Sequence, residues 1–209
     1  MNRRDAIGRV AILMGGAVIG AEFFLSGCKP AGGSAAGVDD LFTSDNTAFL
    51  NEVADTILPT TSSPGAKAAN VGAFMAIMVR DCYTPADQKT FVAGLGKLND
   101  AANKKFGSKF LSLTPQQRTD LLIDLDKEQK AFTADRDKQL SADALKHKGE
   151  ANYKGLEMPN HYFRMIKQLT LTGYFTSEVG ATKALRYIAI PGRYDGCVPY
   201  KKGDKAWAT

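Results

Sequence analysis

The residues that could carry out chemistry are few in this chain and lie far apart. Histidine occurs twice, as His147 and His161, and cysteine three times, as Cys28, Cys82 and Cys197. Neither histidine has another histidine or a cysteine within one helical turn, which a metal site or an imidazole-based catalytic site would need. We therefore predict that His161 is a polar residue at a helix start. No residue is assigned a catalytic, cofactor-binding or metal-binding role.

Other motifs that carry chemistry are also missing from the sequence. No CxxCH run and no group of cysteines could hold a haem or an iron–sulfur cluster. Gly72, Gly94 and Gly96 lie inside helical patterns, whereas a nucleotide loop follows a strand. The acid pair Asp124 and Asp126 belongs to a highly charged stretch, so we interpret it as a solvated helix face without an acid–base role.

The N-terminus has the layout of a bacterial export signal. Arg3 and Arg4 precede an apolar run over residues 10–25, which indicates a twin-arginine signal. The box Leu-Ser-Gly-Cys that ends at Cys28 is typical of a lipoprotein, with Cys28 as the lipidated residue. We predict a signal peptide over 1–27 and an exported protein, in the periplasm, that is anchored to the membrane by lipid.

The alternative to a signal peptide is a membrane-spanning anchor. The apolar run has roughly 16 residues and is interrupted by Glu22, whereas a helix needs roughly 20 to span a bilayer. We therefore favour the signal.

Two thiols remain once Cys28 is lipidated. In an exported protein an even pair is most simply a disulfide, so we predict a bond between Cys82 and Cys197. Two buried free thiols are the alternative.

The rest of the chain divides into a tether and a helical domain. A Gly, Ser and Ala composition predicts a flexible tether over 28–43, and apolar residues at helical spacing follow over 44–209. No long alternation of apolar and polar residues occurs. The predicted fold is all-α, an irregular bundle of five or six helices with a long irregular C-terminal tail. The expected helices are 44–58, 70–82, 85–106, 115 to beyond 126, and 159–174, and residues 139–155 are expected to form a solvated connection.

The net charge excludes one class of partner. A formal charge of +5 is small for 209 residues, and basic residues are mixed with acids instead of forming runs with aromatics. A surface for nucleic acid would show such runs, so none is expected.

The C-terminal stretch from Gly173 to Trp207 is the unusual part of the sequence. Ser177 predicts the cap of a short helix, and Pro191-Gly192 ends regular structure. The segment nevertheless carries many large apolar residues, which must lie against another protein or against the chain's own helices. We favour docking on a partner. The residues expected to make that contact are Tyr187, Arg193, Tyr194, Tyr200 and Trp207.

The amino-acid sequence of this segment resembles that of a known family. GYFTSEVGATKALRY, PGRYDGCVPY and KAW, together with FLNEVADTILP at 49–59, are similar to the gluconate 2-dehydrogenase subunit 3 family. The resemblance implies a non-catalytic small subunit needed for the maturation and twin-arginine export of a large, FAD-containing subunit of the glucose-methanol-choline type. It also implies a cytochrome c subunit that receives the electrons, and a sugar or polyol as substrate of the complex.

A second interpretation stays open from the residues alone. The chain could be a free-standing envelope lipoprotein that binds a ligand or partner in its helical bundle. A neighbouring reading frame for a large flavoprotein would favour the subunit.

Overall fold

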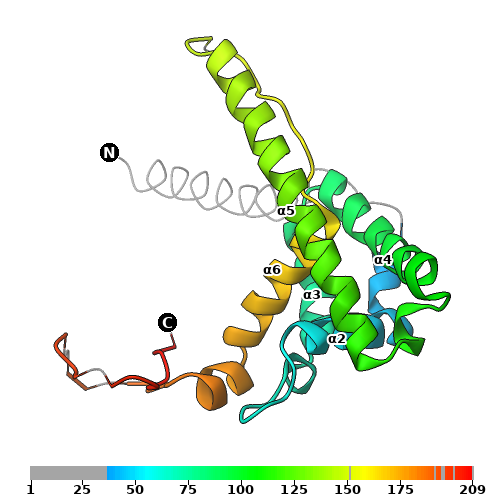
Figure 1. Cartoon of the computed structure of the whole chain (residues 1–209). Helices are drawn as coiled ribbons and strands as arrows, with labels where there is room; N and C mark the ends of the chain where they lie inside the picture. Colours follow the sequence, from blue (N-terminus) through cyan, green and yellow to red (C-terminus); the bar gives the residue numbers. More distant parts are fainter. Residues whose placement is uncertain (1–36, 151, 191, 194–195, 200, 209) are drawn as a thin grey trace, which may run out of the picture. The chain divides into compact units, whose positions relative to one another are not determined.

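The structure is a computed structural model that describes residues 37–150, 152–190, 192–193, 196–199 and 201–208. The described residues form five α-helices and no strand, so the predicted all-α bundle is confirmed (Figure 1). The predicted export residues Arg3 and Arg4 and the predicted lipidation site Cys28 lie outside the described residues. The elements are η1 (Asp39–Phe42), α2 (Ser44–Ile57), η2 (Ala66–Ala69), α3 (Val71–Cys82), α4 (Pro85–Phe106), η3 (Phe110–Ser112), α5 (Pro115–Lys146), α6 (Tyr162–Phe175) and η4 (Gly180–Ala184).

Local signals in the sequence place the helix starts. Thr84 accepts a hydrogen bond from the backbone of Asp87 at 3.2 Å, and Pro85 fills the first helical position of α4. Thr114 and Gln117 form a reciprocal capping box at the start of α5. These contacts satisfy backbone N–H groups that the first helical turn leaves without partners, so both helices begin where the sequence predicts.

Helix α6 lies at the centre of the bundle and contacts α2, α3, α4 and α5. Its buried residues include Phe163, Ile166 and Leu169. The helix begins at Tyr162, three residues after the predicted start, because His161 occupies the cap position with an extended backbone. Since η4 and the C-terminal tail follow α6 directly, this helix fixes where the tail leaves the bundle (Figure 1).

Close packing between α4 and α6 depends on a glycine. A methyl group built on Gly94 would lie 2.5 Å from Cβ of Tyr162. Real Cβ atoms do not approach other atoms so closely, so the absence of a side chain at Gly94 lets the two helices meet. The glycine that looked unremarkable in the sequence is therefore a packing residue.

The folded domain begins earlier than the sequence predicts. Val38 and Leu41 are each only 1% exposed, and Leu41 lies in η1, which contacts α2 and α3. The tether predicted over 28–43 is therefore too long at its C-terminal end. The Gly, Ser and Ala composition near residue 38 predicts a tether, but Val38 and Leu41 are buried by helices that follow later in the chain.

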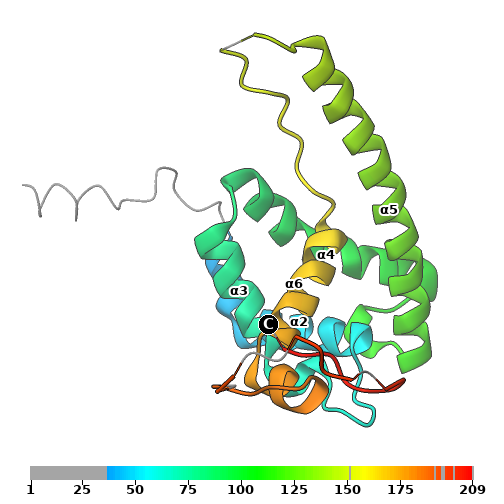
Figure 2. The same ribbon diagram turned by 90° about the vertical axis from the view of Figure 1, so that its left-hand side faces the viewer.

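Helix α5 also differs from the prediction. It continues to Lys146, so half of the connection predicted over 139–155 is helical. Figures 1 and 2 show this half extending beyond the other helices, with the chain after it running back alongside. Asp143 accepts hydrogen bonds from the hydroxyl of Tyr153 at 2.5 Å and the backbone of Leu156 at 3.1 Å, and Arg136 donates to the carbonyl of Met158 at 3.0 Å. These contacts hold a helix that has little apolar surface to bury.

Candidate partner-docking site

The C-terminal tail closes on itself. The backbone N–H of Arg186 donates to the carbonyl of Ala206, and the N–H of Ala208 donates to the carbonyl of Arg186, each at 2.8 Å. The guanidinium of Arg186 also lies over the indole ring of Trp207, 4.5 Å from its centroid. A cation in this position is attracted by the ring's negative face. Residues 187–205 therefore form a loop whose two ends are joined, which we call the tail loop.

Large apolar side chains of the tail loop and its closing pair are exposed. Ile190 is 84% exposed and Tyr187 56%, and Trp207 keeps 45% exposure despite its contact with Arg186. These residues do not cap the chain's own bundle, which was the alternative considered from the sequence. A group of exposed apolar residues is typical of a surface that contacts another protein. The exposed members are Tyr187, Ile188, Ile190, Val198 and Trp207.

A tight turn sets the position of the tail relative to α6. The hydroxyl of Ser177 donates to the carbonyl of Tyr174 at 2.6 Å and accepts from the N–H of Gly180 at 3.0 Å, as a helix cap does. A Cβ at Gly180 would lie 1.9 Å from the carbonyl oxygen of Tyr174, so only glycine fits there. The predicted short helix is a single π-helical turn, η4, which separates α6 from the tail.

The structure describes only part of the predicted contact set. Tyr194 and Tyr200 lie outside the described residues, and Arg193 is exposed within the tail loop. Cys82 and Cys197 are both exposed, free thiols, so the predicted disulfide is not formed in this structure. The tail closes through Arg186 and Trp207 and does not close on the end of α3, where Cys82 lies.

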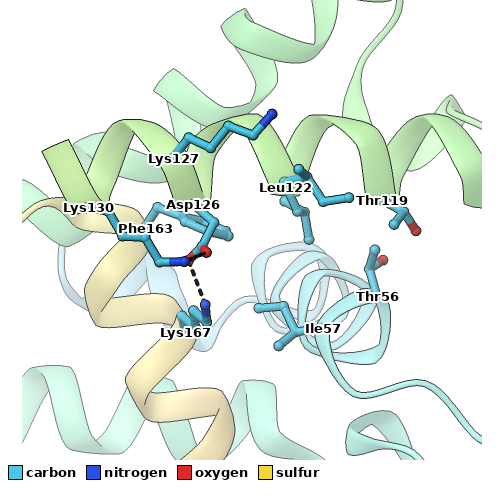
Figure 3. Close-up of a pocket in the computed structure, with 10 residues that line it drawn as sticks. Thr56, Ile57, Thr119, Leu122, Asp126, Lys127, Lys130, Phe163 and Lys167 are labelled. Atoms are coloured by element: carbon cyan, nitrogen blue, oxygen red, sulfur yellow. Dashed lines mark hydrogen bonds and ion pairs between the residues drawn. The ribbon is translucent and has the colours of Figure 1, made fainter.

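A second surface, not foreseen from the sequence, lies between α5 and α6. It consists of two adjoining hollows of about 410 and 480 Å³, which we call the α5–α6 groove. The first hollow has an apolar wall of Ile57, Leu122 and Phe163 (Figure 3). Lys130 and Lys167 line both hollows. The second hollow is lined by Gln129, Lys130, Thr133, Ala134, Asp137, Arg164, Lys167, Gln168 and Leu171.

Asp126 forms an ionic bridge where the two hollows meet. Its carboxylate lies 2.8 Å from the ammonium of Lys130 and 2.5 Å from that of Lys167, which joins α5 to α6 (Figure 3). Hydrogen bonds from Lys130 and then from Lys167 lower the pKa of Asp126 to about 2. The interpretation of Asp126 as part of a solvated helix face is therefore wrong, since its side chain is 20% exposed. For Asp124, 53% exposed, it is correct.

Both histidines make contacts that stabilise the fold. His161 caps α6 by accepting a hydrogen bond from the N–H of Phe163 at 3.2 Å, so the predicted role at a helix start is confirmed. His147 stacks on Tyr153 at a centroid distance of 3.9 Å, at the far end of α5. The hydrogen bond to Asp143 raises the pKa of Tyr153 to about 12. These contacts stabilise the chain reversal after α5.

Two further properties concern the described residues alone. No group of three or more His, Cys, Asp or Glu side chains lies close enough there to hold a metal ion. Across that same part of the chain, every helix is too short or too polar to cross a membrane.

The described residues form a small all-α domain with two surfaces open to solvent, the tail loop and the α5–α6 groove. Comparison with protein families makes the assignment more specific. The family described as gluconate 2-dehydrogenase subunit 3 matches residues 44–192, from the start of α2 into the tail loop, so the chain belongs to this family. Neither the curated proteins nor the solved structures contain a match to the chain. A subunit of a dehydrogenase complex implies a catalytic subunit as its partner.

Proposed function

We propose that this chain is the non-catalytic small subunit of an exported, flavin-dependent dehydrogenase complex and that it docks on the large catalytic subunit through its tail loop. The observation that carries the proposal is the exposure of Tyr187, Ile190 and Trp207 in a segment whose ends are joined. A loop closed before binding loses less conformational entropy when a partner covers it. Aromatic residues held in this way are typical binding hot spots.

The proposal includes a role in export. Arg3 and Arg4 form the twin-arginine pair of the signal, and that pathway carries folded proteins. A small subunit with such a signal would take a flavin-loaded partner with it, since FAD binding requires a folded partner. Lipidation at Cys28 would then hold the complex at the membrane, where a cytochrome c subunit would accept electrons from the flavin. The substrate would be a sugar or a polyol.

The docking proposal is tested by co-purification with a large flavin-containing subunit produced in the same cells. Tyr187→Ala and Trp207→Ala should each weaken the complex about thirtyfold or more, because truncating an interface anchor typically costs about 2 kcal/mol or more. Leu145→Ala is the matched control, since Leu145 is also apolar and exposed but lies at the end of α5. Unchanged co-purification of both tail variants would contradict the proposal.

The export role has its own test. We expect Arg3→Lys combined with Arg4→Lys to leave both subunits in the cytoplasm. Dehydrogenase activity that persists in the periplasm of this double variant would remove the export role. A small subunit that purifies alone from cells making the flavoprotein would favour the free-standing lipoprotein instead.

A further inference from the structure

The α5–α6 groove contains a cationic side chain that lacks a partner. Nη1 of Arg164 is fully shielded from solvent and has no hydrogen-bond partner among the described residues. A buried donor without a partner is unfavourable, and more so when the group is charged. The carboxylate that lines the same hollow, on Asp137, is 58% exposed and is paired with Arg136 at 3.3 Å. Arg164 as a whole is only half-buried and lines the second hollow, and its guanidinium makes no ion pair among the described residues, so the part that faces the hollow is available for an anion from outside the chain.

The groove as a whole carries an excess of positive charge, which also favours an anion. Lys127, Lys130, Lys167 and Arg164 line it, against the carboxylates of Asp126 and Asp137. Asp126 has a low pKa and is ionised at any physiological pH, so this balance is fixed. The bridge from Asp126 also holds Lys130 and Lys167 at the point where the two hollows meet. The groove thus complements a negatively charged occupant.

The form of the groove favours a chain segment over a small molecule. Its two hollows adjoin, and both open to solvent, whereas small-molecule sites usually bury most of the ligand's surface. One half offers the apolar side chain of Ile123, which is 48% exposed, and the other half offers Arg164. An occupant that contacts both halves must carry an apolar group close to a carboxylate. A peptide segment meets this requirement, because its apolar and acidic side chains lie a few residues apart.

The groove is also continuous with the tail. Leu171 lines the second hollow, and Phe175 follows four residues later on the same face of α6. Both side chains are exposed, at 37% and 38%. They connect the groove to η4 and hence to the tail loop, so one partner can cover all three.

We propose that the α5–α6 groove binds an acidic segment of the catalytic subunit, with a carboxylate of that segment on Arg164 and an apolar side chain against the exposed Ile123. This inference rests on the proposed function, because it takes the catalytic subunit as the occupant. It adds a second contact that is electrostatic, whereas the tail contact is apolar. The groove sets the register of the complex and the tail supplies most of the affinity.

The test measures binding of the full chain to the co-expressed flavoprotein at low and high salt. Arg164→Glu should weaken binding about tenfold or more at low salt, and much less at high salt, because a charge-assisted contact is lost. Arg164→Gln should show a smaller loss. Lys89→Glu is the matched charge reversal, since Lys89 is exposed on α4 away from the groove. Melting of each isolated variant shows whether it is folded.

Three outcomes separate the hypotheses. If Arg164→Glu is folded and binds like the unaltered chain while Trp207→Ala is weakened, the groove inference fails and the proposed function stands. If neither variant changes binding, both fail. If succinate raises the melting temperature of the unaltered chain but not that of Arg164→Gln, and binding to the flavoprotein is unchanged, the groove is a small-anion site and the inference is overturned. A photo-crosslinker at Gln168 that captures an acidic peptide of the flavoprotein would support it directly.

Discussion

The helical bundle and the tail loop use similar residues for opposite purposes. In the bundle, Phe91 and Phe163 are at most 1% exposed and pack among helices from distant parts of the sequence. In the tail, Tyr187 and Trp207 are about half exposed, and the contacts that hold the loop are backbone hydrogen bonds and one cation–π pair. The comparison shows that an apolar residue stabilises the fold in the first region and is available to a partner in the second.

The largest effect that this comparison predicts is in the core. Phe91→Ala removes a fully buried ring from α4, so the free energy of unfolding should fall by about 3–5 kcal/mol. Denaturant unfolding followed by circular dichroism measures this change. A loss below about 1 kcal/mol would mean that the bundle is not packed as described.

The next effect tests the packing between α4 and α6. Gly94→Ala should destabilise the chain by about 1–3 kcal/mol, because a methyl group there meets the ring of Tyr162. Gly96→Ala is the matched control on the same helix, where nothing lies within 4 Å of the added carbon. That substitution should stabilise the chain by up to about 1 kcal/mol through helix propensity. Thermal or chemical unfolding should therefore show changes in the free energy of unfolding that have opposite signs for the two variants.

A smaller effect concerns the bridge beneath the groove. Because its pKa is lowered in the folded state, Asp126 stabilises the fold above the pKa of the unfolded chain, near 4, and this stabilisation is lost as pH falls towards 2. Asp126→Asn should lower the free energy of unfolding by about 1–2 kcal/mol at pH 7 and by nearly nothing at pH 2. Asp124→Asn removes a more exposed pair with Lys105 and should lower the free energy of unfolding less than Asp126→Asn does. Equal losses at pH 7 would contradict the distinction between the two carboxylates.

The smallest effect on stability is expected in the tail. Trp207→Ala should change the free energy of unfolding by less than about 1 kcal/mol, because the indole contacts Arg186 and little of the bundle. The same change should make the tail loop more sensitive to proteolysis, since one of the contacts that close it is lost. Limited digestion followed by mass spectrometry measures this sensitivity. A drop in melting temperature as large as that of Phe91→Ala would place Trp207 in the core.

The sequence by itself determined the helices whose starting signals are local. Thr84-Pro85 and Thr114-Pro115 cap their helices through atoms within three residues, so no distant part of the chain is needed to predict them. The apolar spacing of α6 likewise identified its buried face. The family was also evident from the sequence, since FLNEVADTILP and GYFTSEVGATKALRY lie in the matched range 44–192, whereas most of PGRYDGCVPY and all of KAW lie beyond it.

The tertiary structure decided the features that depend on distant residues. Asp124 and Asp126 look alike in the sequence, and only Lys167 of α6, forty-one residues away, makes Asp126 a bridge between helices. The far half of α5 has few apolar residues to reveal it as a helix, and contacts from Tyr153, Leu156 and Met158 stabilise it after the chain reverses. Nothing in the sequence indicates that Arg164 lacks a partner. The shielding of its Nη1 atom arises where α5 packs against α6, because a helix's own sequence does not specify which charged groups its neighbours will cover.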